Sequence, residues 1–247
     1  MVLRSAQFYK YLNVAHLVSF SPMLLLMLKL LPFRSLQAMK KSASFTTDSV
    51  VQAAKWLKEG QLLAYPTESV WGIGCDAYDK AAVQRILDIK QRPKAKGMIV
   101  VTDSAERLAP LLDTLEDSQR QQIINSWQTD SDNIKLQCKQ AHTWLLPIPQ
   151  ALITTIPPWI TGQHRTVAVR VIAHPIIRQL CQQLVSAHNP FGLLVSTSCN
   201  PSGQPPAMTL TDAYGYFDEQ IRYLQAETLG YTLPSQIRDA ITGLIVR

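Results

Sequence analysis

Residues 65–74 read YPTESVWGIG and begin at the end of the apolar run LLAY. The apolar run predicts a buried strand, and the proline stiffens the point where the chain leaves it. Thr67 and Glu68 offer side-chain oxygens there, and Gly72 and Gly74 let the backbone approach a ligand. Glycines that serve only for turning are the alternative. The stretch therefore predicts a binding loop that directly follows a strand.

Outward from this stretch, helical and extended patterns alternate along the chain. Apolar residues at helical spacing predict helices over 48–59, 79–90 and 174–187, with two short helices within 104–126. Apolar runs predict strands over 62–65, 97–102, 142–148, 166–171 and 192–198. The end of the chain, from residue 222, predicts short strands around a loop at 234–239. This alternation predicts an α/β fold with a mixed, twisted sheet and flanking helices.

Four cations follow the second expected helix at intervals of two: Lys90, Arg92, Lys94 and Lys96. Pro93 biases the chain to an extended conformation, in which residues two apart point the same way, so several of these cations would converge on one anion. A triphosphate is an anion of suitable charge. A solvated run of charges is the alternative. The position between an apolar helix and an apolar strand favours the anion site.

Hydroxyl and amide side chains gather after the last long apolar run, in STSCNPSG at 196–203. Ser196, Ser198 and Asn200 suit hydrogen bonds to phosphate oxygens or to an amino-acid carboxylate. A turn whose hydroxyls are satisfied internally is the alternative. The chain contains no G-x-S-x-G elbow, no H-E-x-x-H pair and no Walker loop, so the hydrolase, zinc-protease and P-loop classes lack support.

Two further polar positions lie in or near expected strands. Arg170 interrupts the apolar strand TVAVRV, where a guanidinium needs an anionic partner or the solvent of a cleft. The late polar stretch PSQIRD at 234–239 contains Ser235. Both positions are candidates for binding.

The excess of positive charge lies at the start of the chain. The 247 residues include 24 Lys and Arg against 18 Asp and Glu, and residues 1–47 hold six basic and no acidic residues, so 18 of each remain in the rest. The body of the chain is therefore neutral. Its global charge does not indicate nucleic-acid binding, and any anion site depends on local clustering.

The N-terminal segment contains an apolar run at 22–33 that includes Lys29. A membrane span needs roughly 20 apolar residues, so this run is too short. No pattern of a signal peptide accompanies it. We expect residues 1–47 to lie outside the fold, with Met39 as the true start; a peripheral amphipathic segment is the alternative.

The cysteines form no C-x-x-C pair and have no histidine spacing that suggests zinc. They are Cys75, Cys138, Cys181 and Cys199. We interpret them as free thiols in a reducing compartment, which predicts a cytoplasmic location.

Taken together, these motifs resemble the YrdC/TsaC family of threonylcarbamoyl-AMP synthases over residues 48–247. YPTESVWGIG is similar to the family's Y-P-T-E-x-x-x-G-x-G loop, and Lys90 with Arg92 is similar to its K-x-R. Ser198 with Asn200 is similar to its S-x-N. VAVRV and the late PSQIRD follow in the family's order.

This resemblance implies an open, twisted, mixed sheet with flanking helices and a concave, locally positive cleft, a YrdC-like fold. It implies a nucleotidyltransferase that forms L-threonylcarbamoyladenylate from L-threonine, bicarbonate and ATP with release of pyrophosphate, for the t6A modification of tRNA. Mg²⁺ would accompany ATP. The implied partners are the tRNA-modifying proteins that transfer the threonylcarbamoyl group, with weak binding of tRNA itself and no membrane.

The resemblance also implies roles for individual residues. Lys90 and Arg92 would act in catalysis, and these two with Arg170 would contact the ATP phosphates and the carbamate. Thr67 would hold threonine, and Thr143 matches the family's substrate-contacting threonine. The residues implied to hold nucleotide or phosphate are Ser196, Ser198, Asn200 and Ser235.

One departure from the family lies before the strand that contains Thr143. The family usually has Trp-Pro-Gly-Pro, one residue and then the threonine, whereas QTDSDNIKLQCKQA follows Trp127 here. We expect a polar insertion near 128–141 within a catalytic domain of residues 48–247. Because the rigid lead-in is missing, a non-catalytic RNA- or nucleotide-binding protein of this fold is the alternative, and a carbamoyl-transfer partner is a third.

Overall fold

The structure, a computed structural model, describes residues 45–128, 139–233 and 235–246. Thr46 and Thr47 form a strand within the fold, which corrects the expected boundary of the N-terminal extension at residue 47. Residues 1–44 of that extension, with the expected start at Met39, lie outside the described residues. So do residues 129–138 of the expected insertion. Among the helices of the described part, none is both long and apolar enough to cross a membrane.

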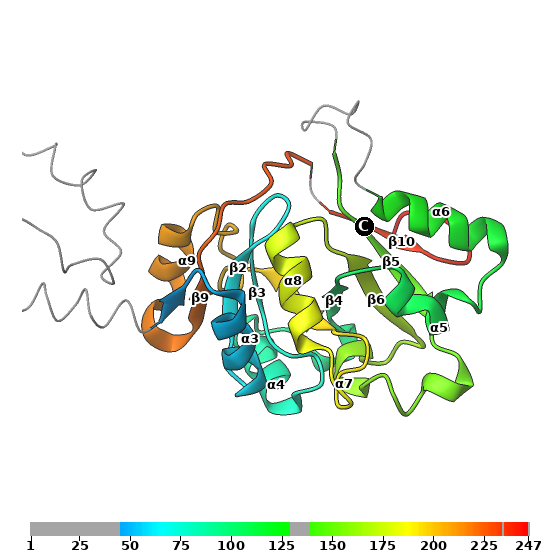
Figure 1. Ribbon diagram of the computed structural model, residues 1–247, viewed down its shortest axis with the longest axis horizontal. Coiled ribbons are helices and arrows are strands. Elements are labelled where there is room, and N and C mark those ends of the chain that lie inside the picture. Colours follow the sequence, from blue (N-terminus) through cyan, green and yellow to red (C-terminus); the bar gives the residue numbers. More distant parts are fainter. Residues whose placement is uncertain (1–44, 129–138, 234, 247) are drawn as a thin grey trace, which may run out of the picture. The chain divides into compact units, whose positions relative to one another are not determined.

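The strands of the described chain form two mixed sheets, each with five strands. The first has the order β1 (Thr46–Thr47), β9 (Arg222–Leu224), β2 (Leu63–Pro66), β3 (Trp71–Gly74) and β8 (Thr197–Ser198). The second has the order β10 (Gln236–Asp239), β5 (His142–Pro147), β6 (Thr166–Val171), β4 (Ile99–Thr102) and β7 (Leu194–Val195) (Figure 1). The expected mixed α/β class is confirmed, with its strands distributed over two sheets.

The stretch YPTESVWGIG folds as an antiparallel hairpin of β2 and β3. Tyr65 pairs with Gly72, and a Cβ at Gly72 would lie 3.2 Å from the Tyr65 ring. A Cβ at Gly74 would overlap the carbonyl of Val195. The expected binding loop is thus only the turn between the two strands. Gly74 is needed for close packing of protein backbone rather than for approach to a ligand, which corrects the sequence interpretation.

The helices surround these sheets. They are α3 (Val50–Lys58), α4 (Lys80–Ile89), α5 (Ala109–Leu112), α6 (Asp117–Trp127), α7 (Pro158–Thr161), α8 (Pro175–Leu184) and α9 (Leu210–Phe217). Helix α4 begins as expected, since the Asp79 side chain accepts a hydrogen bond from the Ala82 N–H at 2.9 Å. Helix α9 was not predicted; its start is the capping box of Thr209 and Asp212.

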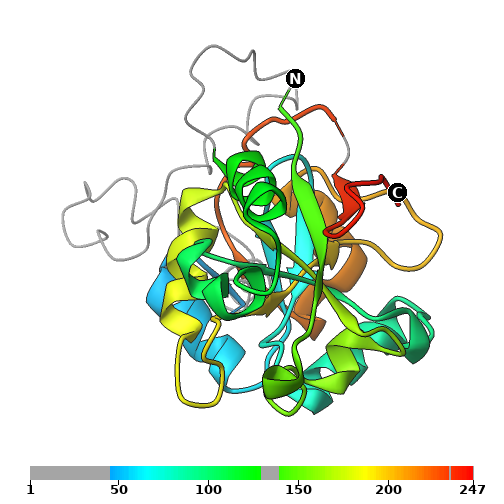
Figure 2. The same ribbon diagram turned by 90° about the vertical axis from the view of Figure 1, so that its right-hand side faces the viewer.

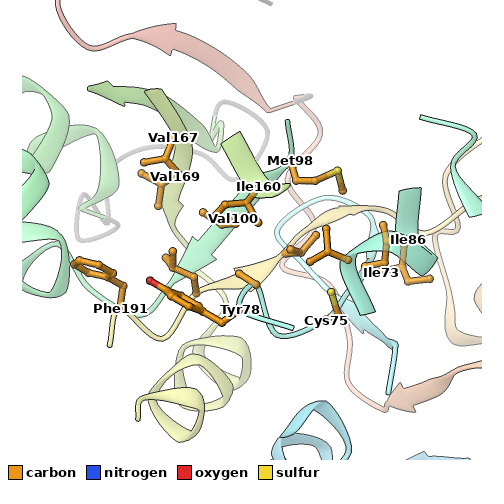
Figure 3. Packing of buried hydrophobic residues seen from close by; sticks show 14 of the residues in the cluster. Ile73, Cys75, Tyr78, Ile86, Met98, Val100, Ile160, Val167, Val169 and Phe191 are labelled. Carbon is orange, nitrogen blue, oxygen red and sulfur yellow. The ribbon is translucent and has the colours of Figure 1, made fainter. Parts of the chain in front are cut away.

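Two clusters of buried side chains hold the sheets and helices together. The larger includes Ile73 of β3, Ile86 of α4 and Val169 of β6 (Figure 3). In the smaller, α3 and α8 pack on Tyr65 of β2 and Val101 of β4. Each cluster contains residues from both sheets, so burial of apolar surface fixes the sheets relative to each other. Cysteines 75, 181 and 199 are buried and free, as expected, and Cys138 lies outside the described residues.

The C-terminal stretch corrects one expectation. Residues 236–239 were expected to belong to a loop, but they form β10, which runs parallel to β5 with Gln236 opposite His142. In Figure 2 this strand and the turn after it, drawn in red, lie beside β5 at the edge of the second sheet. The strand has only four residues. So short a segment shows no clear alternation of apolar and polar residues, which explains why it was missed.

Candidate active site

A cavity of about 460 Å³ is lined by residues of both sheets, including Gly72 of β3, Ile99 of β4 and Ala168 of β6. This volume is in the range of small-molecule binding sites. Ser196 also lines it and is the single residue between β7 and β8. Because β7 belongs to the second sheet and β8 to the first, the chain crosses from one sheet to the other at the wall of the cavity.

Most of the residues expected at the site meet in this cavity. Those that line it are Thr67, Lys90, Arg92, Arg170, Ser196, Ser198 and Ser235. Asn200 and Thr143 do not line it, and both are buried. Segments from 67 to 235, far apart in the sequence, thus converge on one site.

Lys90, the first cation of the run, binds the serine-rich turn at 196–203. It lies at the C-terminal end of α4, and its ammonium donates to the Ser198 carbonyl at 3.0 Å, the Asn200 carbonyl at 2.9 Å and Asn200 Oδ1 at 2.7 Å. Burial, together with the nearby Arg92 charge, lowers the pKa of Lys90 from its ordinary value. An ammonium has three donors, and protein oxygens accept all three here.

The cation run does not have the extended conformation expected of it. Gln91 has a φ of 46°, and Lys94–Lys96 form a turn of 3-10 helix. Arg92 and Lys96 nevertheless line the cavity beside Lys90, whereas Lys94, also in the described chain, does not. The expected convergence therefore holds for three of the four cations, and tight turns produce it rather than alternation along an extended chain. That they bind an anion stays a prediction.

Backbone contacts fix the position of Arg92. Its Nε donates to the Gly97 carbonyl at 3.0 Å. Gly97 has a φ of 62°, and the neighbouring Gly162 has a φ of 64°. A Cβ on Gly162 would overlap the Ala95 carbonyl, so the two loops pack backbone against backbone. The guanidinium is thus held by a rigid support.

The serine-rich turn is also held in place by hydrogen bonds. The Ser196 N–H donates to the Ile99 carbonyl at 2.9 Å, and the Ser198 hydroxyl donates to Asn200 Oδ1 at 2.7 Å. The Asn200 amide donates to the Gln204 carbonyl. The polar groups of this stretch therefore hold the turn together, as the alternative of an internally satisfied turn expects, while Ser196 and Ser198 line the cavity. That they bind a ligand stays a prediction.

Arg170 has an anionic partner and also faces the cleft. Its Nη2 lies 3.2 Å from Oε2 of Glu68, whose Oε1 accepts a hydrogen bond from the Ala173 N–H at 2.9 Å. The sequence interpretation offered the Glu68 oxygens to a ligand, but the side chain is buried and points to Arg170. The adjacent Thr67 lines the cavity, and its hydroxyl donates to the Val70 carbonyl at 2.7 Å.

The cavity is positively charged. Among the described residues that line it, Lys90, Arg92, Lys96 and Arg170 are cationic and none is acidic. The described residues also contain no cluster of three or more His, Cys, Asp or Glu side chains that would suit a metal ion. The site can therefore bind a ligand with several negative charges.

Sequence reasoning missed the apolar part of the lining. Met98, Leu145, Ile160, Ile237 and Val246 lie there. They come from strands, a helix and the C-terminal segment, and each resembles an ordinary core residue in the sequence. His164 was also missed, although it lines the cavity. Apart from Ile237, which belongs to the late PSQIRD stretch, no motif marks these residues, because only the tertiary fold brings them together.

The family model Sua5/YciO/YrdC, described as "Telomere recombination", matches residues 55–247. The threonylcarbamoyl-AMP synthase of Psychrobacter cryohalolentis is 61% identical over 216 residues, which cover 85% of this chain and 100% of that protein. The threonylcarbamoyl-AMP synthase of Moraxella catarrhalis is 43% identical over 203 residues, which cover 82% of this chain and 97% of that protein.

Solved structures show a similar fold. The crystal structure of P. abyssi Sua5 complexed with L-threonine matches with a TM-score of 0.60 at 28% identity and covers 77% of this chain; the match spans 50% of that longer chain. The crystal structure of E. coli YciO matches with a TM-score of 0.59 at 20% identity and covers 82% of this chain and 92% of that one. The likeness to YciO shows only that the two proteins share a fold.

Proposed function

The chain belongs to the Sua5/YciO/YrdC family, and on this premise we propose that it is a threonylcarbamoyl-AMP synthase, an enzyme of the nucleotidyltransferase class. It joins L-threonine, bicarbonate and ATP into L-threonylcarbamoyladenylate and releases pyrophosphate. The observation that carries the proposal is the likeness to a synthase over that protein's whole length. The cation-lined cavity supports it, because both ATP and the carbamate are anions.

The reaction requires the site to hold two anions together. The threonine nitrogen attacks bicarbonate carbon, and loss of water gives a carbamate. A carbamate oxygen then attacks the α-phosphorus of ATP, and the bond to the β-phosphate oxygen breaks, so pyrophosphate leaves. Fixed cations lower the barrier of such a step by stabilising charge that develops on the phosphate oxygens. In our proposal Arg92 and Arg170 supply this stabilisation.

Lys90 has a different position from the two arginines. Its three donors bind Ser198 and Asn200, and Ser198 lines the cavity. Lys90 would therefore act through the turn that it holds as well as through its charge. In this proposal the Ser196 and Ser235 hydroxyls donate to phosphate oxygens. The Ser198 hydroxyl donates to Asn200 Oδ1, and Asn200 keeps the turn and Lys90 in place.

Two threonines are the proposed contacts of the threonine substrate. Thr67 lines the cavity in the turn after β2. Thr143 has a buried hydroxyl with no hydrogen-bond partner among the described residues. It lies two residues before Leu145, which lines the cavity, and therefore on the same face of β5. A buried hydroxyl of this kind would gain a partner when substrate binds.

The proposed metal is Mg²⁺ carried by ATP. The described residues offer no cluster of acidic or histidine ligands, and the cavity lining contains cations. Mg²⁺ bound by phosphate oxygens and water fits this lining, whereas a resident ion held by protein carboxylates does not. When bound, Mg²⁺ would neutralise part of the triphosphate charge, and the side chains would orient the rest.

Exchange of radiolabelled pyrophosphate into ATP tests the proposal, because adenylate formation is reversible. We expect exchange that requires both threonine and bicarbonate. A non-catalytic nucleotide- or RNA-binding protein would bind ATP without exchange, and that outcome would favour the alternative. Delivery of the product to tRNA-modifying proteins, weak tRNA binding and a cytoplasmic location are further parts of the proposal.

A further inference from the structure

Glu68 is a buried carboxylate next to the cavity. Its side chain is 2% exposed, and its two oxygens have different partners. Oε1 accepts the Ala173 N–H at 2.9 Å, and Oε2 lies 3.2 Å from Arg170 Nη2. Arg170 lines the cavity, whereas Glu68, also a described residue, does not. The carboxylate thus anchors one corner of a guanidinium that faces the cavity.

The backbone around Glu68 is fixed on both sides. The Glu68 carbonyl accepts the Tyr231 N–H at 2.9 Å, and the Thr67 carbonyl accepts the Leu229 N–H at 3.2 Å. A late segment of the chain therefore holds the turn that presents the carboxylate. Since the turn is held, the carboxylate can define the orientation of Arg170.

Arg170 needs this partner. Its side chain is 10% exposed and extends from the middle of a five-stranded sheet, and a charge that is so buried is costly without a counter-charge. The nearby cations Lys90, Arg92 and Lys96 line the same cavity and would repel it. Glu68 is the carboxylate that offsets this repulsion, and the ion pair keeps one end of the guanidinium beside it.

We propose that Glu68 is a positioning residue for the reaction: it holds Arg170 so that the remaining N–H groups point to the anionic substrate. This role rests on the proposed adenylate-forming function. Glu68 itself repels a phosphate, so its contribution must come through Arg170. Loss of its charge makes the cavity more positive while Arg170 loses its orientation. Turnover should therefore fall more than substrate affinity does.

Glutamine is the informative replacement because it has the same shape. A carboxamide has one acceptor oxygen and one donor nitrogen. Its single acceptor oxygen can take either the Ala173 N–H or the place beside Arg170, whereas the carboxylate accepts from the Ala173 N–H with one oxygen and forms an ion pair with Arg170 through the other. Glu68→Gln therefore removes the charge and one of the two contacts without leaving a void.

The test compares Glu68→Gln, Arg170→Ala and the double variant in pyrophosphate exchange. We expect Glu68→Gln to lower kcat about tenfold or more and to change the KM for ATP less than about threefold. The double variant should be no slower than Arg170→Ala alone, because Glu68 has nothing to position without the arginine. If Glu68→Gln lowered kcat by the same factor in the Arg170→Ala background as in the wild type, the proposal would be overturned.

Asp103→Asn is the matched control. Asp103 is also a buried carboxylate paired with an arginine, at 2.9 Å from Arg107 Nη2, and neither residue lines the cavity. The Asp103→Asn variant should have a kcat within about twofold of the wild-type value. A similar loss of kcat in this control would show that any broken buried pair disturbs turnover, and that result would contradict the specific role of Glu68. If Glu68→Gln does not fold, Glu68→Asp replaces it, with an expected kcat below wild type.

The NMR signal of the Arg170 Nε–H group provides a readout that does not depend on activity. This group is buried, so its proton should exchange slowly with water, and Arg170→Ala identifies the signal. We expect Glu68→Gln to broaden or shift it. If the wild type has no exchange activity and Glu68→Gln still changes the signal, the proposed function is refuted, while the positioning of Arg170 by Glu68 is kept. An unchanged signal together with an unchanged kcat would refute the positioning role alone.

Discussion

The Tyr65 hydroxyl donates a 3.0 Å hydrogen bond to the carbonyl of Val195, the residue before Ser196. Tyr65 lies in β2 of the first sheet and Val195 ends β7 of the second, so this bond links the sheets beside the point where the chain crosses between them. Burial raises the pKa of the Tyr65 hydroxyl and keeps it a neutral donor. The first residue of the YPTE motif thus supports the serine-rich turn.

Tyr65→Phe tests this support. The substitution removes the hydroxyl and leaves the buried Val195 carbonyl without that donor, which should lower the free energy of unfolding by about 1 to 3 kcal/mol. We also expect a higher KM for ATP, since Ser196 follows directly. Urea unfolding and steady-state exchange kinetics measure both effects. Unchanged stability together with unchanged kinetics would show that the bond has no role.

Gly74→Ala tests the close packing behind the same turn. The new Cβ would overlap the Val195 carbonyl and lie 2.9 Å from the Tyr65 hydroxyl, so we expect a loss of about 1 to 3 kcal/mol or more in the free energy of unfolding. Gly215→Ala is the control. It is exposed within α9 and a Cβ there has no neighbour within 4 Å, so alanine should be neutral or stabilise by up to about 1 kcal/mol. Equal melting temperatures for both variants would contradict the packing explanation.

Arg92→Lys tests the proposed contact with the developing charge. Lysine keeps the charge but loses the planar set of donors, one of which binds the Gly97 carbonyl. We expect kcat in the exchange assay to fall about a hundred- to a thousandfold, as for loss of one transition-state contact worth about 2.7 to 4 kcal/mol. Lys94→Ala, at an exposed position of the same run that does not line the cavity, should be near wild type. If Arg92→Lys retained full exchange, Arg92 would have no part in the chemistry.

Asp103 predicts a pH-dependent contribution to stability. Burial alone would raise the pKa of its carboxyl, but hydrogen bonds and charge from Arg107 outweigh burial and hold the pKa below the ordinary 3.8. The folded state therefore binds the proton less readily than the unfolded state. The contribution is complete above pH 3.8 and is lost as the pH falls through the lower pKa of the folded state.

The measurement compares wild type with Asp103→Asn in urea unfolding across this range. At neutral pH the variant should be less stable by about 1 to 2 kcal/mol, a value reduced by the partial exposure of Arg107. The difference should shrink as the pH falls below 3.8. A difference that stays constant with pH would show that the carboxylate charge does not contribute.

The sequence predicted the elements whose patterns are local. Asp79 marks the start of α4, and the apolar runs around Val100 and Val169 lie in β4 and β6 as expected. The run from Lys90 to Lys96 shows the limit of local reasoning. Pro93 suggested extended chain, but Gln91 turns the chain at the end of α4, and the support from Gly162 comes from a distant segment. The cations meet at the cavity for a reason that spacing does not reveal.

The candidate site likewise contains residues that the sequence predicted and a residue whose partner only the fold shows. Residues that belong to motifs, such as Arg92 and Ser198, were predicted to lie at the site and line the cavity. Glu68 was predicted as a ligand-facing oxygen donor, and only the fold shows that it pairs with Arg170. Which face of a turn a side chain occupies depends on the segments that pack against it, here residues 229–231, and that information is not local.

Direct detection of the product tests the central claim most closely. The protein is incubated with ATP, Mg²⁺, threonine and radiolabelled bicarbonate, and the nucleotides are separated and identified by mass spectrometry. We expect a labelled adenylate with the mass of threonylcarbamoyl-AMP, formed with one pyrophosphate per molecule and absent when threonine is omitted. ATP that binds to the cavity and is recovered unchanged, with no labelled adenylate under any of these conditions, would contradict the claim that this chain is a synthase.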